Sequence, residues 1–364
     1  MLEPAVFDLA AIRAGLPALH AQIYLNSGTV GPLPAVVAQA MRDAVSEDEL
    51  RGRASGRRFA KIHALLADCR ERLGVLVGVS GHEIALTSGT TEGLAIALDR
   101  LDWLPGERIV TSDLEHPDVI ALLEALKGRR GVDIVTVAMA GLDDAAAVEA
   151  FAQVLAPGAK LALLSHVAFG SGRVLPIKAI AAAAHAVGAQ VVVDGAQAVG
   201  AIVVDVPALG ADAYAFPGQK WLMGPEGSGA LVLRRSGVDA SVWERGTAPK
   251  AIWAGLQAAL VWRAELGREA ALAARIARVR EDLRTVLAAH AHVTVITPPD
   301  GAGLLTFRLD GADGPHALQR LSARRIAARD IPGTDWVRLS AGIFVSAADV
   351  AAVGAALAHG EVAA

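Results

Sequence analysis

The chain carries the run VVVDGAQ at residues 191–197, in which an acidic residue ends an apolar, β-branched segment. The segment is apolar without alternation, which is typical of a strand that is covered on both faces. The carboxylate of Asp194 at its end can pair with a protonated ring nitrogen, bind a metal ion or cap a neighbouring helix. A metal site is the least favoured, because no second carboxylate or histidine follows at ligand spacing.

Similar short β-branched runs recur on both sides of this segment, separated by longer Ala/Leu-rich runs. We predict further strands at Ile84–Thr87, Ile109–Thr111, Ile134–Val137, Leu161–Ser165, Tyr214–Phe216 and Ala230–Leu233. We predict helices at Glu92–Asp102, Pro117–Lys127, Asp143–Leu155 and Pro176–Val187. Strand–helix alternation of this length predicts right-handed crossovers and an α/β fold with a mostly parallel sheet flanked by helices.

The pattern changes after about Gly246. A long Ala/Leu/Arg run covers Ile252 to His290, and short strand-like and helical pieces follow it. We therefore expect an N-terminal segment at 1–20, a large domain over 21–245 and a smaller α+β domain over 246–364.

Composition excludes several classes of protein. The 364 residues are 53% hydrophobic, which argues against a disordered chain, and the net charge of -4 disfavours nucleic-acid binding. Glu3 and Asp8 make a signal peptide improbable, and the longest apolar stretch is too short to span a bilayer. We expect a soluble, cytoplasmic protein without nucleic-acid or membrane partners. Cys69 is the single cysteine, so a disulfide within the chain or a cysteine zinc cluster is excluded.

Two further polar clusters follow predicted strands. Ser88, Gly89 and Thr90 open the turn SGTTEG, whose amides and hydroxyls can hold phosphate or simply cap the next helix. It is neither a Walker A loop nor a GxGxxG fingerprint, so nucleotides are disfavoured. Gln219 and Lys220 lie in a glycine-rich, apolar neighbourhood. There desolvation favours the neutral amine that forms a Schiff base, although the lysine alone also fits a surface position.

The three clusters together match what pyridoxal 5'-phosphate (PLP) requires: a phosphate cradle, an acid for the pyridine nitrogen and a Schiff-base lysine. From Leu164 to Leu233 the chain resembles the class V aminotransferase family, which includes cysteine desulfurases and isopenicillin-N-epimerase-like proteins. Matching stretches extend over nearly the whole chain: YLNSG at 24–28, SGTTEG at 88–93, LEH at 114–116, SHV at 165–167, VDGAQ at 193–197, GQKW at 218–221, GPEGSG at 224–229, ERGT at 244–247 and RLS at 338–340.

The resemblance implies the fold of PLP-dependent transferases of fold type I and a role for each matching residue. Lys220 would carry PLP as a Schiff base and shuttle protons, and Asp194 would hold the pyridinium N–H. Gln197 would bond the phenolic oxygen, and His116 would stack on the ring unless it only caps a helix. Ser88, Gly89, Thr90 and Gln219 would surround the phosphate.

Three more roles concern the substrate and a partner subunit. Thr247 would reach a phosphate across the interface of a homodimer with shared active sites, unless it is an ordinary turn residue. Arg338 would bind the carboxylate of a small amino-acid substrate, unless it forms a surface salt bridge. Asn26 would contact the substrate near the entrance.

The chain departs from the family at several positions. Pro217 stands where relatives offer a serine hydroxyl to the phosphate. Ala168 and Phe169 occupy a place where desulfurases carry an Asn, and Phe169 resembles the bulky aromatic of the epimerase-like branch. No cysteine follows Lys220, where desulfurases keep the sulfur-accepting thiol, so the sequence argues against a cysteine desulfurase.

We therefore expect a PLP-dependent aminotransferase first, a C–S lyase second and an amino-acid epimerase third. A non-catalytic regulator that binds PLP, or a phosphate-binding module without PLP, is the alternative from a different class.

Overall fold

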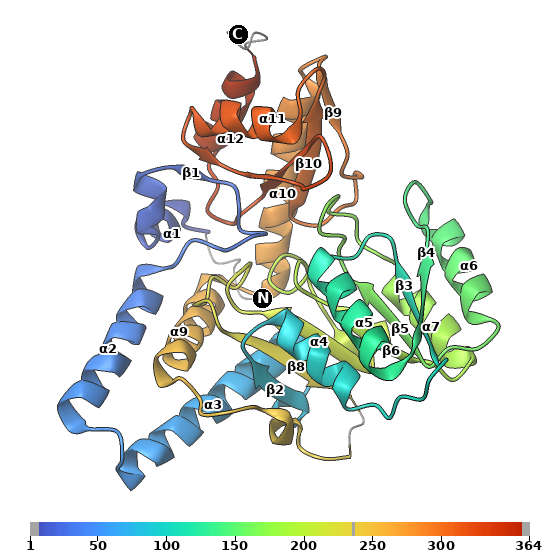
Figure 1. The fold of residues 1–364 in the computed structure, drawn as a ribbon. Helices are drawn as coiled ribbons and strands as arrows, with labels where there is room; N and C mark the ends of the chain where they lie inside the picture. The colour runs from blue at the N-terminus through green and yellow to red at the C-terminus, as the bar shows by residue number, and fades with distance from the viewer. Residues whose placement is uncertain (1–6, 235–236, 359–364) are drawn as a thin grey trace, which may run out of the picture.

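A seven-stranded sheet forms the centre of the larger part of the molecule (Figure 1) in the computed structural model, which describes residues 7–234 and 237–358. Its strands are β2 (Ile84–Thr87), β3 (Arg108–Ser112), β4 (Asp133–Val137), β5 (Leu161–Ser165), β6 (Gln190–Asp194), β7 (Ala213–Pro217) and β8 (Gly229–Leu233). Their order is β2-β8-β7-β6-β5-β3-β4, and only β8 runs antiparallel to its neighbours. The predicted α/β fold with a mostly parallel sheet is confirmed.

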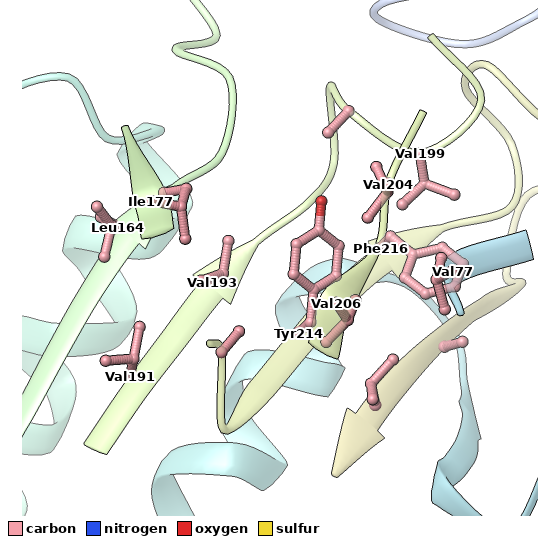
Figure 2. Packing of buried hydrophobic residues seen from close by; sticks show 14 of the residues in the cluster. Val77, Leu164, Ile177, Val191, Val193, Val199, Val204, Val206, Tyr214 and Phe216 are labelled. Atoms are coloured by element: carbon pink, nitrogen blue, oxygen red, sulfur yellow. The ribbon is translucent and has the colours of Figure 1, made fainter. Parts of the chain in front are cut away.

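Alternate residues of the central strands pack on opposite faces of the sheet. Val191 and Val193 of β6 join Tyr214 and Phe216 of β7 in one buried cluster (Figure 2), whereas Val192 belongs to another. Helices α3 (Gly56–Val77), α6 (Asp144–Leu155), α7 (Ile177–Ala186) and α9 (Lys250–Leu266) contribute to the first cluster, and α4 (Thr90–Asp99) and α5 (Pro117–Arg130) contribute to the second. The strands are thus covered on both faces, which explains why their sequences are apolar without alternation.

A second, smaller core lies beyond the large sheet. It combines α10 (Glu269–Ala288), α11 (Gly314–Ser322) and α12 (Ala347–Leu357) with an antiparallel sheet of β12 (Arg329–Asp330), β13 (Trp336–Ser340), β10 (Leu304–Leu309) and β9 (Val293–Val295). Ile12 of α1 (Leu9–Ala14) is buried in the same core, and β1 (Ile23–Tyr24) pairs with β11 (Ile326–Ala327). The beginning of the chain therefore packs with its C-terminal part.

The region expected to change pattern after residue 246 is divided between the two cores. The long run at 252–290 forms two helices, of which α9 packs on α2 (Ala35–Arg51) and α3, while α10 belongs to the second core. The proposed domain limits at 20 and 245 stay predictions, and their outer ends at 1–6 and 359–364 lie outside the described residues. No helix in the described part of the chain is long and apolar enough to cross a membrane.

Short elements complete the chain between these helices and strands. They are η1 (Pro17–His20), η2 (Gly81–Glu83), α8 (Val206–Leu209) and η3 (Ala240–Trp243). Helix α4 begins at Thr90, two residues before the expected start, so the SGTT turn itself enters the helix. It ends at Asp99 rather than Asp102, and the Trp103 indole then folds back to donate a hydrogen bond of 2.8 Å to the Leu98 carbonyl.

Candidate active site

The carboxyl ends of β2, β3, β5, β6 and β7 meet at one edge of the sheet, and the residues that follow them line a single cavity of about 520 Å³. The predicted site residues that line it are Ser88, Gly89, Thr90, His116, Asp194, Gln197, Gln219, Lys220 and Arg338. Ligands of open α/β sheets bind at this edge. The structure thus brings together nine side chains and backbone positions that are far apart in the sequence.

Lys220 and Asp194 face this cavity from the ends of neighbouring strands. Asp194 is buried, and its Oδ1 accepts a hydrogen bond of 2.8 Å from the Ala196 amide, which leaves the other oxygen without a partner in the described chain. Burial raises the pKa of Asp194, and the nearby Lys220 opposes that rise. Burial likewise lowers the pKa of Lys220 to about 8, against the opposing pull of Asp194. The site therefore holds an amine that loses its proton easily beside a carboxyl with one free oxygen.

The turn before α4 forms a cradle of polar groups. Gly89 occupies the N-cap position of the ten-residue helix α4. The Thr90 hydroxyl and Gln219 Oε1 are buried, and neither has a hydrogen-bond partner among the described residues. Buried polar groups without partners in a cavity are expected to bind a ligand or water, and amides at a helix start favour an anion. This cradle fits the phosphate of PLP, just as Asp194 fits its ring nitrogen and Lys220 its aldehyde.

His116 forms one wall of the cavity together with Phe169. Their rings meet edge to face, with centroids 4.8 Å apart. His116 is also the N-cap of α5, where its Nδ1 accepts a hydrogen bond of 3.2 Å from the Asp118 amide. Burial lowers the pKa of His116, which favours the neutral ring. The capping role therefore exists, and the ring also lines the cavity, so its stacking on PLP stays a prediction.

Gln197 is held by two partners on the far side of the cavity. Its Nε2 donates to the Gly28 carbonyl at 2.8 Å, and its Oε1 accepts from the Trp221 indole at 3.0 Å. A side-chain amide carries two N–H donors, so one donor remains for a ligand. This arrangement orients the amide that we predict to bond the phenolic oxygen.

Two arginines from the smaller core close the cavity. Arg338 is buried, and it donates to the Phe169 carbonyl at 2.7 Å and to the Thr29 hydroxyl at 3.2 Å, while its Nε has no partner among the described residues. Arg329 lies opposite it in the β12–β13 register and reaches the same hydroxyl at 3.5 Å. Burial, with a smaller contribution from Arg329, lowers the pKa of Arg338 to about 9. Neither guanidinium forms an ion pair with a carboxylate of the described chain, so the pair is poised for an anionic ligand.

Three positions that were named from the sequence add no polar side chain to the cavity. Asn26 does not line the cavity; its Oδ1 accepts a hydrogen bond of 2.7 Å from Thr29, which does line it. Thr247 is exposed and outside the cavity lining of this single chain, so its role at a dimer interface, like the homodimer itself, stays a prediction. Pro217 ends β7 within the lining and offers no hydroxyl there.

Sequence reasoning missed a buried polar cluster behind Asp194. The carboxyl of Glu115 bonds the Ser112 hydroxyl on one side and accepts a hydrogen bond of 2.6 Å from the Ser165 hydroxyl on the other. Ser165 lines the cavity and pairs with Asp194 in the β5–β6 register. Burial raises the pKa of Glu115 to about 7. The signal was available in the sequence, because Glu115 directly precedes His116 after a predicted strand.

A parallel α/β sheet with a lysine, a buried carboxyl and a phosphate cradle at its carboxyl edge defines a PLP-dependent enzyme. The model of the family described as "Aminotransferase class-V" matches residues 23–241, and the chain belongs to that family. The resemblance stated from the motifs is thereby confirmed, and so are the fold and the cofactor.

Two similar proteins are named as probable cysteine desulfurases. The chain is 31% identical over 223 residues to a probable cysteine desulfurase of Methanothermobacter thermautotrophicus, a match that covers 60% of this chain and 55% of that relative. It is 28% identical to a probable cysteine desulfurase of Vibrio cholerae over 95% of this chain and 96% of the relative.

Two similar solved structures are of C-DES, which is described as a cystine C–S lyase. The cystine C–S lyase C-DES, in complex with its reaction product cysteine persulfide, shares 29% identity at a TM-score of 0.90, over 94% of this chain and 99% of that one. A C-DES mutant with glycine covalently linked to its PLP cofactor has a TM-score of 0.91 at 28% identity, over 95% and 98%.

Proposed function

We propose that this chain is a PLP-dependent C–S lyase that cleaves the bond between Cβ and sulfur in a small sulfur-containing amino acid. The observation that carries the proposal is the lining of the cavity: it contains the residues predicted to bind PLP, and no thiol lies among them. The likeness to the cystine C–S lyase C-DES supports it. The transamination that the sequence placed first has no such support among these relatives.

The single cysteine is unsuited to accept sulfur from a substrate. Cys69 lies within α3, is fully buried, and its Sγ contacts the Trp253 carbonyl at 3.6 Å. Burial raises its pKa to about 12, so the reactive thiolate is scarce at neutral pH. A sulfur atom released in the cavity therefore has no acceptor in this chain and leaves with its own fragment of the substrate.

The net reaction balances with one water molecule. R–S–CH2–CH(NH3+)–COO− and H2O give R–SH, pyruvate and ammonium. The electron pair of the Cβ–S bond leaves with sulfur, and the pair of the Cα–H bond takes its place between the two carbons. No external oxidant or reductant is needed.

The chain's own residues divide this work. When bound, PLP supplies an electron sink for the pair released at Cα. With a pKa of about 8, roughly one Lys220 amine in ten is neutral at pH 7 and able to remove the Cα proton. Arg338, with Arg329 beside it, would bind the substrate carboxylate and fix the direction of the Cα–H bond. Asp194 would keep the ring nitrogen protonated.

Product analysis tests the proposal. Purified protein reconstituted with PLP is mixed separately with L-cystine and L-cysteine, and pyruvate, alanine, keto acids and enantiomers are quantified. We expect pyruvate and a sulfur-bearing product in equal amounts. Alanine in place of pyruvate would establish desulfuration, which the names of the curated relatives favour. A keto acid that requires an added acceptor would establish transamination, and an inverted substrate would establish epimerisation.

The cofactor assignment has its own test. The protein should show a visible absorbance band that borohydride bleaches, and mass spectrometry should then locate the added mass on Lys220. Lys220→Ala is the control and should show neither. A native protein that never carries the coenzyme on this residue would end the proposal.

A further inference from the structure

Arg263 is a fully buried arginine of α9 that no part of the proposed chemistry uses. Its side chain is 2% exposed. The guanidinium donates to the Trp221 carbonyl at 3.1 Å and to the Gly200 carbonyl at 2.8 Å. It also forms a two-pronged ion pair with Glu269, with both distances at 2.7 Å. One side chain thus joins two backbone segments that follow strands β6 and β7 to the first turn of α10.

The two backbone segments are those that carry candidate cofactor contacts. Trp221 directly follows Lys220, and Gly200 comes three residues after Gln197. The segments also touch each other: Gly200 has a φ of 88°, and a Cβ there would come within 2.9 Å of the Leu222 side chain. The Trp221 indole reaches back to Gln197 Oε1. Arg263 therefore binds both segments, although it does not line the cavity itself.

The geometry requires a guanidinium. Four acceptor atoms lie around it, two carbonyl oxygens and two carboxylate oxygens, and only the planar fork of arginine reaches all of them at once. An ammonium is a point charge and keeps fewer of these bonds. Glu269 balances the buried charge, so the arrangement adds little net field at the cavity.

We propose that Arg263 is a positioning residue, which fixes the Lys220 and Gln197 segments relative to each other so that both face the cofactor. The inference rests on the proposed role of Lys220 as the cofactor-bearing residue. It does not depend on whether the enzyme eliminates, transaminates or epimerises.

Arg280 of α10 provides a matched control. It is also a buried arginine, and it donates to the backbone carbonyls of Pro299 at 2.7 Å and Ala302 at 3.3 Å. Neither of those residues lines the cavity. Arg280→Met therefore removes a buried guanidinium with two backbone acceptors and leaves the site segments alone.

The experiment compares Arg263→Lys, Arg263→Met and Arg280→Met with the native protein. The first readout is the affinity of cofactor-free protein for PLP, measured by absorbance titration. The second is the pH profile with which an amine-reactive reagent labels Lys220 in cofactor-free protein, followed by mass spectrometry. The charged groups that act on this amine are Asp194, Arg338, Arg329 and Asp118, all unchanged in these variants.

We expect the native labelling midpoint near pH 8, because burial holds the Lys220 pKa there. Release of the segment should move the midpoint in Arg263→Lys up by about one pH unit, because the amine regains water. Its PLP affinity should fall about tenfold, the loss of one or two hydrogen bonds. Arg280→Met should keep the native midpoint and its affinity to within about twofold.

Two outcomes would overturn the inference. One is native labelling and native PLP affinity in Arg263→Lys and in any folded Arg263→Met. The other is an equal loss in Arg280→Met, which would assign the effect to general destabilisation. Because labelling uses cofactor-free protein and no substrate, either outcome leaves the proposed C–S lyase activity untouched. A failure of that activity alone would leave the positioning role standing.

Discussion

Replacing the single cysteine separates a C–S lyase from an enzyme that passes sulfur to its own thiol. Cys69→Ala removes a sulfur atom that is fully buried against the Trp253 carbonyl, outside the cavity. With a pKa of about 12, only about one Cys69 thiol in 10⁵ is ionised at pH 7, so its loss removes almost no nucleophile. We therefore expect kcat/KM for pyruvate formation within about twofold of the native value.

Cys69→Ala should also lower the free energy of unfolding. A buried side chain cut back to alanine leaves a small cavity, and for one sulfur atom we expect a loss of about 1–2 kcal/mol. In a protein of this size that lowers Tm by roughly 1–3 °C. Cys69→Ser is the companion variant, because it keeps most of the volume and its hydroxyl can still donate to the Trp253 carbonyl, so it should be no more destabilising than Cys69→Ala.

The assay follows pyruvate and reduced sulfur from L-cystine in parallel with thermal unfolding. A Cys69→Ala protein that is folded at the assay temperature, yet releases sulfur more than tenfold more slowly, would refute the reasoning. Lys220→Ala gives the background of the assay, because it should release neither pyruvate nor reduced sulfur.

Three other substitutions test the remaining assignments. Arg338→Lys should raise KM about tenfold or more with a smaller change in kcat, because an ammonium makes one hydrogen bond fewer to the substrate carboxylate than a guanidinium. An unchanged KM in steady-state kinetics would show that Arg338 does not bind the substrate. Asp194→Asn should weaken PLP binding and slow exchange of the Cα proton for deuterium by at least about a hundredfold, because the ring nitrogen loses its charged partner; NMR that detects native exchange would mean that the partner is misassigned. Glu115 has a folded-state pKa raised to about 7, so its carboxyl favours folding below its ordinary pKa and loses that advantage as pH rises toward 7. The stability of the native protein relative to Glu115→Gln, from urea unfolding, should therefore fall by roughly 2–3 kcal/mol between about pH 4.5 and 7 and then level off; a difference that is constant across this range would show that Glu115 titrates normally.

Residues at strand ends were the ones that sequence reasoning found. Asp194, Lys220 and the SGTT turn each follow a run whose composition identifies a buried strand, and in a mostly parallel sheet those ends meet at one edge. The motif and the topology therefore agree without any knowledge of contacts. The sequence-based order of reactions had no such physical constraint, because the three reactions share these residues.

In the smaller core, Arg338 was predicted from the family motif, whereas its neighbour Arg329 was not. Arg329 lies on a strand of two residues, and it meets Arg338 only through the antiparallel register of β12 and β13. No periodicity marks so short a strand. Asn26 was chosen instead of Thr29 within one tight turn, where the backbone decides which side chain faces the cavity. The tie from Arg263 to the Lys220 segment spans 42 positions and is invisible without the fold.

In the roles proposed for them, Lys220, Asp194 and Arg338 only prepare the loss of the Cα proton, so the outcome of the reaction depends on what surrounds Cβ of the substrate. Transamination and epimerisation need a proton returned to the substrate or to the cofactor before anything leaves. Elimination needs only a leaving group that accepts the electron pair, and sulfur attached to Cβ provides one. The part of the cavity wall that Phe169 and His116 form holds no thiol to intercept the sulfur. We therefore expect elimination, as proposed above. Phe169→Asn, which introduces an Asn in the segment where desulfurases carry one, should leave pyruvate as the product unless a cysteine is also added near the cavity. Alanine from that single variant would contradict the proposed elimination.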